Sequence, residues 1–234
     1  MAMESYYYAF LLLISLSIPL LRSFEPLIRF WQKWLPLFAG TLVMMLVFIP
    51  WDIVFTQHEV WSFNHRYVLG AYLFGLPIEE WLFFVVIPYV IVFTYEVFRY
   101  FLPRLDFPRL SFWLSVLLGV FFVLVGLLNT GRTYTLVVML LTGFLALLQP
   151  VLGTHKKFLS HFYFTYLVML VPFILVNGAL TGLFSEAPVV SYDDARNLGI
   201  RILTIPIEDS VYLMGMMFIT FMVYERLKPK PAAL

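Results

Sequence analysis

Two pairs of adjacent carboxylic acids, each directly after a Pro-Ile dipeptide, are the residues of this 234-residue chain best suited to chemistry. They are Glu79-Glu80 and Glu208-Asp209. Because two neighbouring carboxylates repel each other, one member of such a pair in water-poor surroundings is expected to keep its proton while the other stays ionised. A pair of this kind offers a general acid and a general base at one place.

A proline followed by acidic residues is also an ordinary helix start, because proline fits the first helical turn and carboxylates suit the positive end of the helix dipole. The sequence before the first pair favours a further role. Apolar residues continue upstream over 67–76, and one helix over 67–98 would be about 48 Å long, too long for a single straight span. We therefore expect the chain to break near Gly70, Gly75 and Pro77, which would place the glutamates below the membrane interface.

The residues around both pairs are those of a membrane protein. Hydrophobic residues make up 62% of the chain and charged residues 12%, about half the charged fraction of a typical soluble domain. Apolar runs have the length needed to cross a ~30 Å hydrocarbon core, and lipid requires their backbones to be helical. The predicted fold class is an all-α integral membrane protein with seven transmembrane helices, at residues 6–21, 34–55, 77–98, 110–128, 134–152, 158–180 and 202–224.

The sequence contains an internal repeat at a spacing of 129 residues. Three motifs coincide at this shift: Leu-Gly at 69 and 198, Pro-Ile-Glu at 77 and 206, and Tyr-Glu at 95 and 224. Spans one to three therefore match spans five to seven, and the fourth span restores the chain direction so that the two units run parallel. An ionisable residue within a bilayer indicates function, and its recurrence in both units strengthens that interpretation.

The repeat also predicts a domain organisation. We expect a first three-helix repeat over residues 1–100, a linker with the fourth transmembrane helix over 101–131, and a second three-helix repeat over 132–234. Both carboxyl pairs would then lie at the same depth, near the outer ends of the third and seventh spans.

Basic residues are distributed unevenly between the two sides of the predicted bundle. The side of the N-terminus carries Arg66, Arg132 and Arg196. The opposite side carries Arg22, Arg29, Lys33, Arg99, Arg104, Arg109, Lys156, Lys157, Arg226, Lys228 and Lys230. Cytoplasmic loops carry the excess of basic residues, so we expect a multi-pass protein of a bacterial plasma membrane with its N-terminus outside and its C-terminus in the cytoplasm.

Other polar residues are expected at the outer level of the carboxyl pairs. Asp52 ends the second span and Asn177 lies at the matching end of the sixth. We interpret both as lining a pocket, because each is carried on a span that precedes a carboxyl motif. Trp51 and Trp61 are interpreted as interfacial anchors.

The cytoplasmic face carries the two Tyr-Glu motifs, at 95–96 and 224–225, beside Arg99 and Arg226. We interpret them as an aromatic belt with salt-bridged ends.

The residues required for several other kinds of chemistry are absent from this sequence. It has no cysteines, which excludes disulfides, zinc thiolate sites and cysteine nucleophiles. The four histidines have no metal-site spacing, and no aspartate-rich motif, phosphate loop or dinucleotide fingerprint is present. A net charge of +1 provides no basic field for nucleic acid. We expect neither a metal nor a cofactor.

The motifs Pro-Ile-Glu-Glu at 77–80 and Pro-Ile-Glu-Asp at 206–209 resemble the Pro-x-Glu-(Glu/Asp) signature of the heterodimeric-type lycopene cyclases. In that family two small three-span subunits each carry one motif, and in some bacteria, archaea and fungi they are fused into one seven-span domain. The segments 51–64, 177–182 and 201–212 also look like family sequence. The resemblance covers nearly the whole chain, which looks like the fused form.

The resemblance implies cyclisation of the acyclic ends of lycopene to β-ionone rings without net redox change. An acid would protonate a terminal alkene, the cation would close the ring, and a base would remove a proton, which suits paired carboxyls. We expect Glu79 and Glu208 as the central acids, with Glu80 and Asp209 as their partners, in one composite site between the repeats.

Aromatic residues near the motifs could stabilise a cation, although ordinary packing is the alternative for each of them. Those within a turn of a motif are Trp81, Phe83, Phe84 and Tyr212.

Two other functions fit the same residues. A related carotenoid end-group enzyme, such as a hydratase or a partner of an elongase, would let water intercept the cation. A proton-coupled transporter or a lipophile-binding protein also fits parallel repeats with membrane carboxyls. The expected partners are lycopene or a related acyclic carotene, the lipid bilayer and other carotenoid enzymes, with no nucleic acid.

Overall fold

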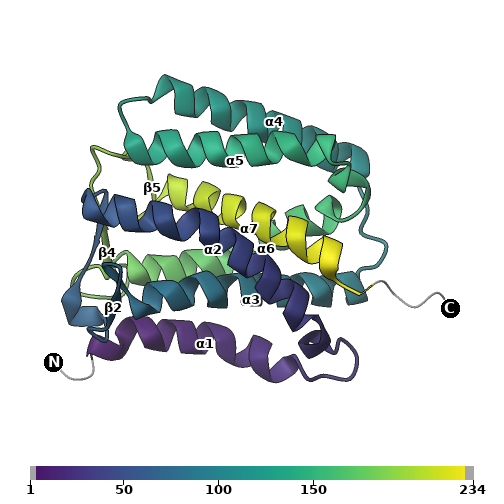
Figure 1. The fold of residues 1–234 in the computed structure, drawn as a ribbon, viewed down its shortest axis with the longest axis horizontal. Helices are drawn as coiled ribbons and strands as arrows, with labels where there is room; N and C mark the ends of the chain where they lie inside the picture. Colours follow the sequence, from purple (N-terminus) through teal and green to yellow (C-terminus); the bar gives the residue numbers. More distant parts are fainter. Residues whose placement is uncertain (1–3, 230–234) are drawn as a thin grey trace.

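The computed structural model describes residues 4–229, which form seven long helices joined by short connections (Figure 1). All seven are long and apolar enough to cross a membrane. They are α1 Tyr7–Arg22, α2 Trp34–Gln57, α3 Ile78–Phe101, α4 Pro108–Leu128, α5 Thr133–Val151, α6 Leu159–Leu180 and α7 Ile207–Leu227. Of the basic residues counted above, Lys230 lies outside the described residues.

Short elements fill the connections between the helices. The 3-10 helices are η1 Glu4–Tyr6, η2 Phe30–Lys33, η3 His65–Tyr67 and η4 Thr154–Lys156. The strands are β1 Trp61–Phe63, β2 Tyr72–Leu73, β3 Leu76–Pro77, β4 Val190–Tyr192, β5 Arg201–Ile202 and β6 Ile205–Pro206.

The seven predicted spans are confirmed, but α7 begins at Ile207 rather than at residue 202. Residues 201–206 instead form a hairpin of β5 and β6, and its turn holds Leu203 at a φ of 57°, which a right-handed helix does not allow. The same hairpin precedes α3, with Phe74 and Gly75 at positive φ. The predicted break near Gly75 and Pro77 is therefore confirmed, and both carboxyl pairs lie in the first turn of a helix.

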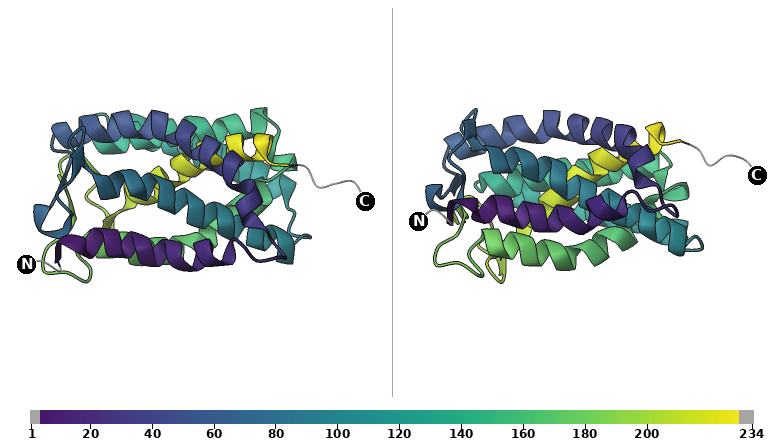
Figure 2. Two further views of the ribbon diagram at one scale, coloured as in Figure 1. Left: turned by 60° about the horizontal axis from the view of Figure 1, so that its bottom comes forward. Right: turned by 90° about the horizontal axis from the view of Figure 1, so that it is seen from below.

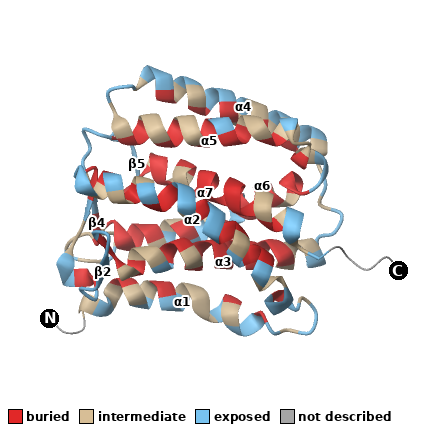
Figure 3. Cartoon of the chain, in the orientation of Figure 1, coloured by how far each residue is buried: buried red, intermediate tan, exposed pale blue. Residues whose placement is uncertain are grey.

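The helices lie side by side, with the short strands gathered at one end of the bundle (Figures 1 and 2). Helix α4 packs on α5 along one edge, α1 packs on α3 along the other, and α2 packs on α7 between them. The N-terminal end of the described chain is at the strand end, and the C-terminal end is at the opposite end (Figure 2). Helix α7 is the most buried of the seven, whereas α1 and α4 expose most of their surface (Figure 3). The carboxyl pair of α7 therefore begins the most enclosed helix.

Strands β1 and β4 join the two repeats at the strand end. They pair antiparallel, with Ser62 opposite Ser191 at the centre of the register. These two serines are separated by the same 129 residues that relate the sequence repeats. Equivalent positions of the two repeats thus meet face to face, as a twofold relation between parallel repeats requires.

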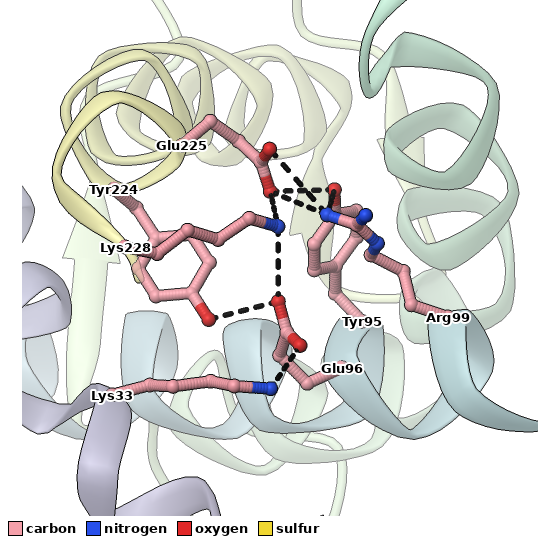
Figure 4. Close-up of polar contacts among 7 residues, drawn as sticks. All are labelled: Lys33, Tyr95, Glu96, Arg99, Tyr224, Glu225 and Lys228. Atoms are coloured by element: carbon pink, nitrogen blue, oxygen red, sulfur yellow. Dashed lines mark hydrogen bonds and ion pairs between the residues drawn. The ribbon is translucent and has the colours of Figure 1, made fainter. Parts of the chain in front are cut away.

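The opposite end of the bundle is joined by a crossed pair of hydrogen bonds (Figure 4). Tyr95 donates to Glu225 at 2.7 Å, and Tyr224 donates to Glu96 at 2.8 Å. The two bonds are again equivalent under the 129-residue shift. Three basic side chains form ion pairs with these carboxylates: Lys33, Arg99 and Lys228.

The crossed pair corrects one interpretation of the sequence. Tyr95 and Tyr224 are fully buried between α3 and α7, so they are not an interfacial belt. The predicted ion pairing is present for Arg99, which binds Glu225 at 3.2 Å. Lys228, which stands 129 residues after Arg99, takes the equivalent place in the second repeat.

Candidate active site

A cavity of about 50 Å³ lies between the helices near the strand end. Three carboxylic acids line it: Asp52 from α2, Glu80 from α3 and Asp209 from α7. The other polar lining residues are Tyr8, Tyr134, Asn177, Tyr192 and Tyr212. The apolar ones are Trp61, Phe63, Phe83, Phe173, Leu180, Val190, Leu213 and Met216. Both repeats contribute to the cavity, since α2 and α3 belong to the first and α7 to the second.

Asp209 is held by three hydrogen-bond donors. Tyr134 donates to Oδ1 at 2.6 Å, while Asn177 and Tyr192 donate to Oδ2 at 2.8 and 2.9 Å. Each donor comes from a different element of the second repeat: α5, α6 and β4. Because both oxygens accept, the surroundings of Asp209 fit an ionised carboxylate, which is an acceptor only.

Among the described residues, Glu80 receives a single hydrogen bond, from Tyr8 to Oε2 at 2.7 Å. This contact parallels the one at Asp209, because Tyr8 and Tyr134 both lie on the first helix of their own repeat. The two tyrosines are 126 residues apart rather than 129, so the match between the repeats is looser in the first helix. Glu80 is therefore less constrained than Asp209 at an equivalent position.

Asp52 brings a third carboxyl group to the cavity. Its Oδ1 accepts a 2.8 Å hydrogen bond from the indole N–H of Trp61. Its Oδ2 is buried and has no hydrogen-bond partner among the described residues. A buried carboxyl oxygen of this kind is costly when it is ionised and unpaired, so it needs a proton or a neighbouring donor.

No lysine, arginine or histidine is among the described residues that line the cavity. Glu80 and Asp209 do lie in the first turns of α3 and α7, where the positive end of the helix dipole favours a negative charge. Tyr192, on strand β4, stays a donor: burial, and then the nearby Asp209 carboxyl, raise the pKa of its phenol well above the usual value.

Glu79 and Glu208 point away from this cavity, towards the loops that precede their hairpins. Oε1 of Glu79 accepts the backbone N–H of Leu69 at 2.6 Å, and Oε1 of Glu208 accepts that of Leu198 at 2.7 Å. Thr135 also donates to Glu208 at 2.6 Å. In both glutamates Oε2 is buried without a partner among the described residues.

Comparison with known proteins supplies the family. The family model described as lycopene cyclase matches residues 5–98 and 131–227, which is most of the chain. The chain belongs to the lycopene cyclase family. The bifunctional lycopene cyclase/phytoene synthase of Neurospora crassa is 37% identical over 51 residues, which are 22% of this chain and 8% of that protein. The aligned part therefore spans less than a tenth of that relative, and no solved structure matches the chain.

The match to the lycopene cyclase family falls into two segments that follow the repeat. The first segment contains α1 to α3 with Glu80, and the second contains α5 to α7 with Asp209. Helix α4 lies between the two matched segments. In this family member the cavity is thus lined from both matched segments.

The aromatic residues singled out near the motifs divide into two groups in this lycopene cyclase family member. Phe83 and Tyr212 line the cavity. Phe84 is buried behind Tyr212, with ring centroids 6.4 Å apart, and Trp81 donates from its indole N–H to the Leu73 carbonyl outside the cavity.

Asp52 and Asn177 both line the cavity. Trp61 was interpreted as an interfacial anchor, and that is wrong, because it is 6% exposed and bonds to Asp52. Trp51 is half-buried and packs against Tyr212, with ring centroids 5.1 Å apart.

Sequence reasoning missed the tyrosines that hold the carboxyls, namely Tyr8, Tyr134 and Tyr192. The signal for two of them was present, because Tyr8 and Tyr134 open the first helix of their repeats. The signal was weak because the repeats are offset there by three residues. Tyr192 stands opposite Trp61 in the strand pair, and that pairing joins segments remote in the sequence.

Proposed function

We propose that this protein cyclises the acyclic end group of lycopene, or of a related acyclic carotene, to a β-ionone ring. The observation that carries the proposal is the cavity itself, in which Asp52, Glu80 and Asp209 share a space lined by aromatic and aliphatic side chains. Such a site combines proton donors and acceptors with walls that do not trap a cation. Membership of the lycopene cyclase family supports the same chemistry.

The charge balance of the cavity supports a resident proton. Three ionised carboxylates without a basic side chain among the lining residues would repel one another strongly in surroundings of low polarity. We assign Asp209 as the carboxylate, since three donors satisfy it. Glu80 is the proton donor, with Asp52 as a neighbouring carboxyl of the cavity, because the two together accept few hydrogen bonds.

The reaction then balances without an oxidant or a reductant. Glu80 protonates C2 of the terminal alkene and leaves a tertiary cation at C1. The C5=C6 double bond attacks C1, so that the C1–C6 bond forms and the positive charge moves to C5. Asp209 removes the proton from C6, which restores the C5=C6 bond in the ring. A proton returns from Asp209 to Glu80 across the cavity before the next turnover.

The cavity walls support the cationic steps. The rings of Trp61, Phe83 and Tyr212 line the cavity and offer aromatic faces, which stabilise a cation without acting as nucleophiles. The Asp209 carboxylate offsets the same positive charge. At about 50 Å³ the cavity holds only a few water molecules, whereas ligand pockets usually enclose about 300 Å³ or more. Substrate entry therefore requires side chains of the wall to move.

Glu79 and Glu208 take a positioning role in this proposal. Each fixes the backbone N–H of the loop before its hairpin, and so sets the start of the helix that carries Glu80 or Asp209. In this proposal the second member of each pair, Glu80 or Asp209, takes the acid–base role that the sequence predicted for Glu79 and Glu208.

The site is a single composite one in this proposal, formed between a first repeat at 1–100 and a second at 132–234 that are joined by the linker at 101–131. The ion-paired end with Lys33, Arg99 and Lys228 faces the cytoplasm, and the strand end faces outward, in a bacterial plasma membrane. The acyclic substrate reaches the site from the bilayer.

Expression in a host that accumulates lycopene, followed by pigment analysis, tests the function. We expect a carotene with a β-ring. A hydroxylated acyclic product would contradict cyclisation and show that the protein is a hydratase. Unchanged lycopene at a normal amount of membrane protein would contradict both enzyme activities and favour transport or binding.

A further inference from the structure

A second, apolar groove of about 330 Å³ opens on the side of the bundle between α1, α3 and α6. Its wall includes Ile14 and Ser15 from α1, Val90 from α3, and Met169 and Val176 from α6. The hydroxyl of Ser15, a polar group of this wall, donates to the backbone carbonyl of Leu11 at 2.7 Å. The groove therefore suits a hydrocarbon rather than a headgroup or a solute.

The groove continues the acid cavity along the same helices. Phe173 lines both spaces and is only 8% exposed. On α3 the lining passes from Glu80 and Phe83 in the cavity to Ile87 and Val90 in the groove. Glu80 and Val90 are ten residues apart, or about 15 Å along a helix. A linear chain could thus lie in the groove with its end beyond Phe173.

The equivalent place in the other half of the bundle is closed. Gly40 of α2 packs so tightly on α7 that an added Cβ would lie 2.6 Å from the carbonyl oxygen of Thr220. The residues 129 positions away from this pair are Met169 and Ile91, and both line the groove. Met169 and Ile91 therefore keep α6 apart from α3, whereas at the equivalent place Gly40 lets α2 pack closely on α7.

We propose that this groove binds the polyene chain of the substrate behind its reacting end, with Phe173 as the movable wall between groove and acid cavity. The inference rests on the proposed function, and it commits to the conjugated hydrocarbon rather than to a lipid acyl chain as occupant. Continuity with the acid cavity is the reason, since a lipid chain makes no use of the carboxyls at the end. Because one groove serves one cavity, a substrate with two acyclic ends must leave and re-enter between cyclisations.

The test compares a bulky substitution in the groove with the same substitution at the repeat-equivalent position on α2. Val176→Trp places an indole in the groove, while Val47→Trp makes the same change at the repeat-equivalent position, which is 41% exposed on α2. Initial rates are measured with purified protein in lipid vesicles. The substrates are lycopene and a shorter acyclic hydrocarbon with the same end group that does not reach the groove.

We expect Val176→Trp to lower the lycopene rate about tenfold or more, and to leave the short substrate within about twofold of the unmodified protein. Val47→Trp should change neither rate. Equal lycopene rates in the two variants would contradict the proposal that the groove binds the polyene chain. So would equal losses with both substrates, which would place the damage in the acid cavity. A single-ring carotene should accumulate before the two-ring product.

A second pair of variants guards against misfolding. Ile14→Trp narrows the groove from α1, and its neighbour Leu13, which is 64% exposed and lies outside the groove, gives the control Leu13→Trp. If the unmodified protein forms no ring from either substrate, the proposed function fails. The groove is then tested by the absorption shift of bound lycopene, which Val176→Trp must lose and Val47→Trp must keep.

Discussion

The hydroxyl of Tyr134 donates a 2.6 Å hydrogen bond to Oδ1 of Asp209, and this bond joins the first helix of the second repeat to its third. Tyr8 makes the corresponding 2.7 Å bond to Glu80 in the first repeat. Asp209 has two further donors, whereas within residues 4–229 Glu80 has none beyond Tyr8. Two equivalent positions thus offer different hydrogen-bonding environments, which is how one pair of side chains can supply both an acid and a base.

Replacement of Tyr134 by phenylalanine should slow cyclisation roughly 10- to 100-fold, because the Asp209 carboxylate loses one of three donors. The initial rate with lycopene is the measurement. Tyr163→Phe is the matched control, since it removes a 2.6 Å bond to Ser115 outside the cavity. Equal rates in the two variants would remove Tyr134 from the site.

Asp209→Asn should abolish ring formation. The asparagine amide would carry an N–H group where the carboxylate now accepts from Asn177 and Tyr192, and it cannot take up the C6 proton. Asp194→Asn changes an exposed residue of the same type and should cyclise at the normal rate. The amount of each protein in the membrane fraction is measured beside the pigments. Ring formation by Asp209→Asn would show that another group is the base.

Glu79 should affect stability more than chemistry. Glu79→Ala leaves the Leu69 N–H without its acceptor and should lower the free energy of unfolding by about 1–3 kcal/mol, with activity per folded protein kept. Glu79→Gln keeps an acceptor oxygen and should behave almost normally. Thermal unfolding in detergent separates the two. A Glu79→Gln variant that is fully folded but inactive would show that Glu79 acts as an acid in the reaction.

The crossed pair at the other end should hold the repeats together. Tyr95→Phe and Tyr224→Phe should each lower the unfolding temperature, because each removes a buried hydrogen bond to a carboxylate worth about 1.5–3 kcal/mol. Tyr100→Phe, at a position 48% exposed, should have little effect. Unchanged unfolding temperatures in both buried variants would mean that the far end contributes little to holding the helices.

The sequence was sufficient for the seven spans, because lipid requires long apolar helices and leaves few alternatives. It also predicted the repeat and the pocket residues Asp52 and Asn177. It placed the start of α7 five residues too early, since a two-strand hairpin of apolar residues has the composition of a span.

The choice between neighbours within each carboxyl pair was beyond the sequence. Glu79 and Glu80 differ by only about 100° around a helix, and which of them faces the cavity depends on where the other helices lie. Those positions are set by contacts such as Gly40 on Thr220 and the Ser62–Ser191 strand pair, which join remote segments. For the same reason the partner tyrosines became visible only in the folded chain.

The most direct test compares two adjacent substitutions in a lycopene-accumulating host. Glu80→Gln removes the proton donor from the cavity. Glu79→Gln makes the same change one residue earlier, where the glutamine oxygen can still accept the hydrogen bond from the Leu69 N–H. We predict β-ring carotenes with the unmodified protein and with Glu79→Gln, and only lycopene with Glu80→Gln at an equal amount of membrane protein. Normal ring formation by Glu80→Gln would contradict the account.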